Sequence, residues 1–137
     1  MQLDPIRVKD TREWMQKSRE DLRRCERLLS DPSPDIEDAL FHSQQAVEKA
    51  FKAFLTWHDE PFGRTHDLRQ LSKQCAKIDP AFQVFAGQIG RLTQYAWVFR
   101  YPSDVPEPTL AQASDAASLA REVVEAVLAR LPDEVQS

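Results

Sequence analysis

The sequence predicts an all-α protein, an antiparallel up-and-down four-helix bundle with one additional short helix. Apolar residues recur at helical spacing through four long segments, proline-containing segments separate these patterns, and only three glycines occur among 137 residues. A chain of this length commonly forms one domain around one core. We therefore expect a single helical domain over residues 1–137, with its core at about residues 10–131.

The first helix is expected from about residue 10 to residue 30. Trp14, Ser18, Leu22 and Cys25 recur there at helical spacing, and Asp21 falls inside the same apolar stripe. An unpaired buried carboxylate is costly, so Asp21 needs a partner, and a buried ion pair or a helix cap is favoured over a reactive acid. The segment SDPSPD at 30–35 ends this helix and caps the next.

The second helix is expected from about residue 36 to residue 58, with one apolar and one polar face. The polar face carries His42, Gln45, Glu48, Lys49 and Lys52, with Phe41 among them. Lys49 and Lys52 are candidates for contact with an anionic ligand, although such a row also fits a solvated surface. A large aromatic side chain on a polar face, such as Phe41, is typical of an interface.

Three further helices complete the expected bundle. A loop at 59–64 leads to a short helix that Thr65 is expected to cap and that ends near residue 77. Asp79 and Pro80 suit the start of a fourth helix, which stops at the proline-rich segment RYPSDVPEP, residues 100–108. Thr109 and Gln112 have the spacing of a capping box for the last helix, whose inward stripe extends to residue 131.

Composition and spacing argue against several classes of protein. Cys25 and Cys75 lie far apart and match no metal-ligand spacing, so we expect neither a metal nor a disulfide framework. The sequence has no Gly-rich phosphate loop and no HExxH pattern, so no cofactor and no catalytic residue are assigned. Without a signal-peptide pattern or a membrane-spanning apolar run, the expected compartment is the cytoplasm, with no membrane partner.

Two places could hold a nucleotide or another phosphate. Arg100 and Tyr101 end the fourth helix, where a guanidinium and a phenol can reach a phosphate or a base. Alternatively, Arg100 satisfies helix-terminal carbonyls or pairs with Asp21. His66 lies with Arg64 and Asp67 at the start of the short helix, whose free N–H groups could bind an anion or whose side chains could only order the loop.

The fourth helix also carries candidate interface residues. Trp97 and Val98 lie on different sides of this helix, so at least one of them faces away from the core of its own chain. Together with Phe41, they indicate a homodimer interface.

Four sequence blocks resemble the HEPN domain in their order and spacing, and they cover nearly the whole chain. These blocks are WxxxSxxDLxxCxxLL at 14–29, ALFHSQQAVEKAFKAFL at 39–55, THDL at 65–68 and RYP at 100–102. The resemblance implies a bundle of four long helices with a short extra one, usually dimeric. It also implies nucleotide binding, as in HEPN proteins that act as accessory partners of minimal nucleotidyltransferases in prokaryotes. Many other HEPN proteins resemble metal-independent ribonucleases that use an Arg-x(4–6)-His motif.

That ribonuclease motif is absent here, because no arginine precedes His42, His58 or His66 with four to six residues between them. The favoured function is therefore a non-catalytic nucleotide- or RNA-binding module that partners a minimal nucleotidyltransferase in a toxin–antitoxin-like system. Arg100 and Tyr101 would hold the ligand, helped by Lys49, Lys52 or His66, and Asp21 would hold Arg100. Two alternatives stay open: a metal-independent ribonuclease toxin, and a helix-mediated assembly module without nucleotide affinity.

Overall fold

The computed structural model describes residues 3–98 and 107–136, except for the side chains of residues 94–98, and these residues form helices without a strand. The predicted all-α bundle is confirmed. Its elements are α1 (Pro5–Ser30), α2 (Ile36–Trp57), α3 (Leu68–Ile78), the 3₁₀ helix η1 (Pro80–Phe85), α4 (Ala86–Val98), α5 (Leu110–Leu128) and the short α6 (Asp133–Gln136).

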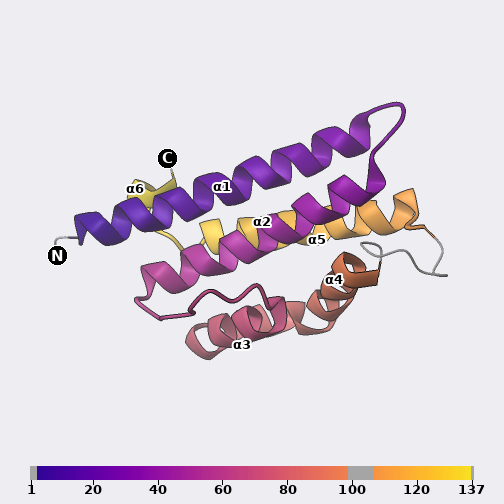
Figure 1. Cartoon of the computed structure of the whole chain (residues 1–137). Helices are drawn as coiled ribbons and strands as arrows, with labels where there is room; N and C mark the ends of the chain where they lie inside the picture. The colour runs from indigo at the N-terminus through magenta and orange to yellow at the C-terminus, as the bar shows by residue number, and fades with distance from the viewer. Residues whose placement is uncertain (1–2, 99–106, 137) are drawn as a thin grey trace.

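Helix α2 lies at the centre of the bundle (Figure 1). It packs along α1 over most of its length, against α5 on a second side, and against α3 and α4 on a third. Every residue from Ala46 to Leu55 is therefore buried except Lys49, which is partly buried. The predicted solvated face of α2 is wrong for Glu48 and Lys52, because α1 and the loop after α2 cover the surface on which these two residues lie.

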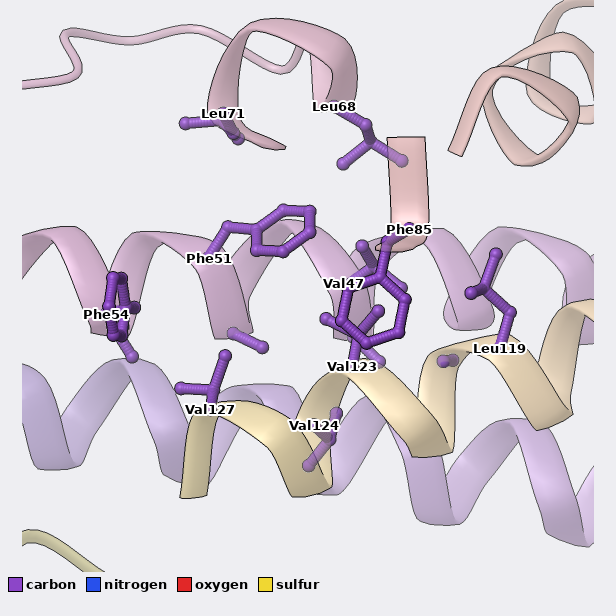
Figure 2. Close-up of a cluster of buried hydrophobic side chains, with 14 of the residues drawn as sticks. Val47, Phe51, Phe54, Leu68, Leu71, Phe85, Leu119, Val123, Val124 and Val127 are labelled. Carbon is purple, nitrogen blue, oxygen red and sulfur yellow. The ribbon is translucent and has the colours of Figure 1, made fainter. Parts of the chain in front are cut away.

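The core is built where α2, α3, η1 and α5 meet (Figure 2). Phe51 is fully buried, and its ring meets the edge of Phe82 at a centroid distance of 6.2 Å. Phe54 packs on the same ring at 4.7 Å. Val123 and Val127 of α5 belong to the same cluster and lie on the side of Phe51 away from Leu71 (Figure 2). Edge-to-face aromatic packing adds to the free energy gained by burying these large apolar side chains.

Local side-chain hydrogen bonds set where the helices begin. The capping box predicted at Thr109 and Gln112 is confirmed, with both reciprocal hydrogen bonds present. For α3 the predicted cap was wrong, because Asp67 Oδ1, and not Thr65, accepts hydrogen bonds from the first backbone N–H groups of the helix. Thr65 instead accepts from the N–H of Asp67 and so orients the capping residue.

Three other boundaries differ from the sequence prediction. Helix α1 begins at Pro5 and not near residue 10, with Asp4 as its N-cap. After Asp79 the chain forms the 3₁₀ helix η1 before α4 begins at Ala86. A 3₁₀ helix has three residues per turn, which places Phe82 and Phe85 on the same side, and both are buried. The last helix ends at Leu128, and Leu131 is buried in the turn that leads to α6. Arg12 and Arg19 of α1 hold α6 by donating to its backbone carbonyls.

Replacing Phe51 tests this description of the core. The substitution Phe51→Ala should lower the free energy of unfolding by about 3–5 kcal/mol, because it leaves a cavity between α2 and η1. Val84 is 71% exposed, so Val84→Ala should change the free energy of unfolding by less than about 0.5 kcal/mol. Urea denaturation measures both. Equal losses for the two variants would contradict this assignment of the core.

His58 ends α2 and makes stability depend on pH. Partial burial lowers its pKa below the ordinary 6.5, and the charge of Arg7 lowers it further, against the opposing carboxylates of Asp79 and Glu60. The folded state therefore favours the neutral imidazole of His58. This contribution to the free energy of unfolding is fully present above the ordinary pKa of 6.5 and is lost as the pH falls from there through the lowered pKa of the folded state. We expect His58→Gln to lose less stability than the wild type between about pH 7.5 and pH 5. Denaturation at both pH values measures this difference, and parallel losses would contradict it.

Candidate ligand-binding site

A half-buried group of charged side chains joins α1 to α2. Lys49 Nζ lies 2.5 Å from Asp21 Oδ2, and His42 Nδ1 lies 2.7 Å from Asp21 Oδ1. His42 and Lys49 are seven residues apart on α2, two turns along the same face, so both reach one carboxylate. Exposed fractions of the three side chains are 12% for Asp21, 15% for His42 and 22% for Lys49. We call these three residues, with Asp38, the Asp21 cluster.

Hydrogen bonding fixes the orientation of the imidazole in this cluster. An ionised carboxylate can only accept, so His42 donates from Nδ1 to Asp21. The other ring nitrogen, Nε2, lies 3.6 Å from Asp38 Oδ1. The ring of Phe41 meets the imidazole at a steep angle, with centroids 5.2 Å apart. His42 is thus held between two carboxylates and one aromatic ring.

Two exposed cations lie beside the Asp21 cluster. Lys17 and Arg24 lie on α1 about one turn before and one turn after Asp21, and both are exposed. Within residues 3–98 and 107–136, neither of them forms an ion pair, whereas both oxygens of Asp21 already have a cationic or imidazole partner. Such an arrangement can attract an anion to the seam between α1 and α2.

A second charged group lies further along α2 and is more deeply buried. Glu48 Oε2 lies 3.2 Å from Lys52 Nζ and 3.1 Å from His66 Nδ1. The Lys52 ammonium also lies over two aromatic rings, 5.4 Å from the centroid of Trp14 and 5.6 Å from that of Phe62. We call these five residues the Glu48 cluster. An ammonium group removed from water is stabilised by a nearby carboxylate and by the faces of aromatic rings. The contacts of the Glu48 cluster therefore explain how Lys52 can be buried.

The two clusters differ in what they offer to a ligand. Side chains of Glu48 and Lys52 are only 7% and 5% exposed, whereas His66 is 80% exposed. Lys52 cannot reach an external anion without leaving Glu48. The Glu48 cluster therefore serves to attach the loop carrying Phe62 and His66 to α1 and α2, and the Asp21 cluster is the better candidate for ligand contact.

A comparison of the sequence with protein families identifies this architecture. The model of the HEPN domain matches residues 11–131, which is most of the chain. The chain belongs to the HEPN domain family. Neither the curated proteins nor the solved structures contain a match to it. The predicted resemblance is thus confirmed at the level of the family.

Not every residue predicted for the HEPN site falls within the described structure. Arg100 and Tyr101 lie outside the described residues, as do the side chains of Trp97 and Val98 on α4. The expected pairing of Asp21 with Arg100 therefore stays a prediction, and the described partners of Asp21 are Lys49 and His42. Lys52 and His66 are brought together, but on Glu48, whereas Lys49 lies on a different carboxylate.

The described part of this HEPN domain holds no group of three His, Cys, Asp or Glu residues able to bind a metal ion. Burial raises the pKa of Cys25 to about 12 and that of Cys75 still further, which makes both thiols unreactive. Among the described helices, none has the length and apolar character needed to cross a membrane. The described polar chemistry thus lies in ion pairs and not in thiol or metal sites.

Sequence reasoning missed how the charged residues of α2 pair. It placed His42, Glu48, Lys49 and Lys52 together on one solvated face. A signal for the real pairing was present, because Asp21 needed a partner and the seven-residue spacing of His42 and Lys49 puts both on one line along α2. Nothing in the sequence indicated that Trp14 and Phe62 would enclose Lys52, since this depends on where the loop after α2 folds back.

The ion pair of Asp21 with Lys49 should be measurable by a double-mutant cycle. Asp21→Asn, Lys49→Gln and the double variant should show a coupling energy of about 1–3 kcal/mol, because the pair is largely withdrawn from water. The exposed pair of Lys9 with Glu13 is the control and should couple by less than about 0.5 kcal/mol. Denaturant unfolding measures both cycles. Additive losses at Asp21 and Lys49 would contradict the assignment.

Proposed function

We propose that this HEPN domain is a non-catalytic module that binds a nucleotide or an RNA segment beside the Asp21 cluster. In this proposal it acts as the accessory partner of a minimal nucleotidyltransferase in a toxin–antitoxin-like system. The observation that carries the ligand proposal is the pair of exposed cations, Lys17 and Arg24, that have no ion pair in the described chain and lie beside the Asp21 cluster. Membership of the HEPN family supports the choice of nucleotide or RNA as the anion.

The charges at this seam suit a phosphate in particular. Lys49 is already engaged by Asp21, but its side chain is 22% exposed and can share its ammonium protons with a second acceptor. Lys17 and Arg24 are exposed and lack an ion pair in the described chain. A phosphate placed between them would gain several charge-assisted hydrogen bonds without requiring a buried ion pair to break.

A binding role fits the histidines of this chain better than a catalytic one. The sequence has no Arg-x(4–6)-His motif. His42 has both ring nitrogens next to carboxylates, 2.7 Å from Asp21 and 3.6 Å from Asp38. His66 is directed to Glu48. Neither histidine follows an arginine at the spacing of the ribonuclease motif, which is why we favour binding over RNA cleavage.

Thermal-shift measurements with nucleotides and short RNAs, in the presence of a chelator, test this proposal. A ligand at about a hundred times its dissociation constant adds roughly 2.7 kcal/mol, so the wild-type midpoint should rise by several degrees. The variant Lys17→Gln/Arg24→Gln should lose most of this shift. Lys73→Gln/Lys77→Gln, which removes the same charge from the exposed surface of α3, is the matched control and should keep it.

The same samples distinguish the other functions. Recovered RNA should be intact, and RNA shortened by the wild type but not by Arg100→Ala would favour a ribonuclease instead. No shift with any nucleotide or RNA would contradict ligand binding and favour an assembly module. If the shift is lost equally in the α1 and α3 variants, the ligand responds only to net charge and the proposed position is wrong.

A further inference from the structure

A surface cleft of about 250 Å³ lies between α4 and α5. Its floor is apolar, because it is formed by the buried side chains of Leu92, Ala116 and Leu119. In the described part of the chain, α4 packs on α2 and α3 and makes little contact with α5, which leaves this space between the two helices. Pockets that take drug-sized ligands have volumes of roughly 300–1,000 Å³, so this cleft suits a smaller molecule.

Charged side chains of both signs line the two sides of this cleft. Arg91 lines it from α4, whereas Asp115 and Glu122 line it from α5. All three are exposed, and among the residues that the structure describes none of them has an ion-pair partner. Arg121, which is also on α5, contrasts with them because it pairs with Glu26. The cleft therefore presents one guanidinium and two carboxylates to a ligand.

The two carboxylates are spaced along α5 with part of the apolar floor between them. Asp115 and Glu122 lie two helical turns apart on the same side of α5, a rise of about 10 Å. Ala116 and Leu119 of the floor lie between them. A ligand that satisfies both carboxylates therefore needs two cationic groups separated by an apolar stem. Because the carboxylates outnumber the single guanidinium of Arg91, the lining favours a ligand with a net positive charge.

We propose that this cleft binds a free basic amino acid, one that carries an ammonium or guanidinium group on an aliphatic side chain. Its α-carboxylate would bind Arg91, since a guanidinium can donate two parallel hydrogen bonds to a carboxylate. Its α-ammonium and its side-chain cation would each bind one of the two carboxylates of α5. Its aliphatic stem would lie on Leu92 and Leu119 of the floor. Such a ligand carries the charges opposite to those of the lining.

Other small ligands match fewer of these features. Cadaverine, which is L-lysine without its carboxylate, supplies both cations but no anion for Arg91. L-Leucine supplies a carboxylate and one ammonium, and it leaves one carboxylate of the cleft without a partner. A nucleotide would bring its phosphates close to two carboxylates and be repelled by them. The inference is independent of the ligand proposed beside the Asp21 cluster, because no residue of that site lines the cleft.

Isothermal titration calorimetry with L-lysine, L-arginine, L-leucine and cadaverine tests the proposal. The wild type should bind L-lysine or L-arginine with a dissociation constant on the order of 1 mM or below, and at least about tenfold more tightly than L-leucine or cadaverine. N-Acetyl-L-lysine, which resembles the C-terminal residue of a peptide and lacks the α-ammonium, should bind at least about fivefold more weakly than L-lysine. Equal binding of these two would overturn the assignment to a free amino acid.

Arg91→Gln separates recognition of the carboxylate from damage to the cleft. This variant should lose most of the preference for L-lysine over cadaverine, because only L-lysine has a carboxylate. A distorted cleft would weaken both ligands alike and keep the preference, and this result would overturn the proposed role of Arg91. Arg23→Gln removes the same charge from the exposed surface of α1 and should keep the wild-type preference.

A second pair of variants tests the acidic side of the cleft. Asp115→Asn/Glu122→Gln should weaken binding of L-lysine at least about tenfold, because both cations of the ligand lose their partners. Asp10→Asn/Glu20→Gln changes the net charge equally on the exposed surface of α1 and should bind L-lysine like the wild type. Circular dichroism establishes that each variant is folded. Equal weakening in the two double variants, or a wild type that binds neither basic amino acid at about 10 mM, would overturn the proposal.

Discussion

The burial of α2 is the constraint on which the rest of the structure depends. Helices pack on three sides of it, so its polar residues cannot be left to solvent. A buried charge without a partner costs several kcal/mol, and the fold meets this cost by pairing each one. Glu48 pairs with Lys52, while Lys49 and His42 share Asp21 of α1. These contacts fix how α1 and the loop after α2 lie against the central helix.

Charge is neutralised near the centre of the bundle, where Asp21 and Glu48 each contact a lysine and a histidine. At the surface, Lys17 and Arg24 lie beside the Asp21 cluster without an ion pair in the described chain. The cleft between α4 and α5 is lined by charged side chains of both signs. The paired charges hold the helices together, whereas the unpaired surface charges stay accessible to solvent.

The three histidines of this HEPN domain lie in different surroundings. His42 lies between Asp21 and Asp38, and His66 contacts Glu48. His58 ends α2, with its ring 4.5 Å from that of Phe54. His42 and His66 thus join separate segments of the chain, and none of the three histidines follows an arginine at the spacing of the ribonuclease motif.

The sequence by itself determined the helices and several of their ends, because helical periodicity and capping act over only a few residues. Local sequence patterns predicted both the Thr109–Gln112 capping box and the need of Asp21 for a partner. Tertiary structure decided which residues meet Asp21, that Glu48 and Lys52 are buried, and that a 3₁₀ helix follows Asp79. These outcomes depend on which helix covers which face, and no local pattern in the sequence specifies that.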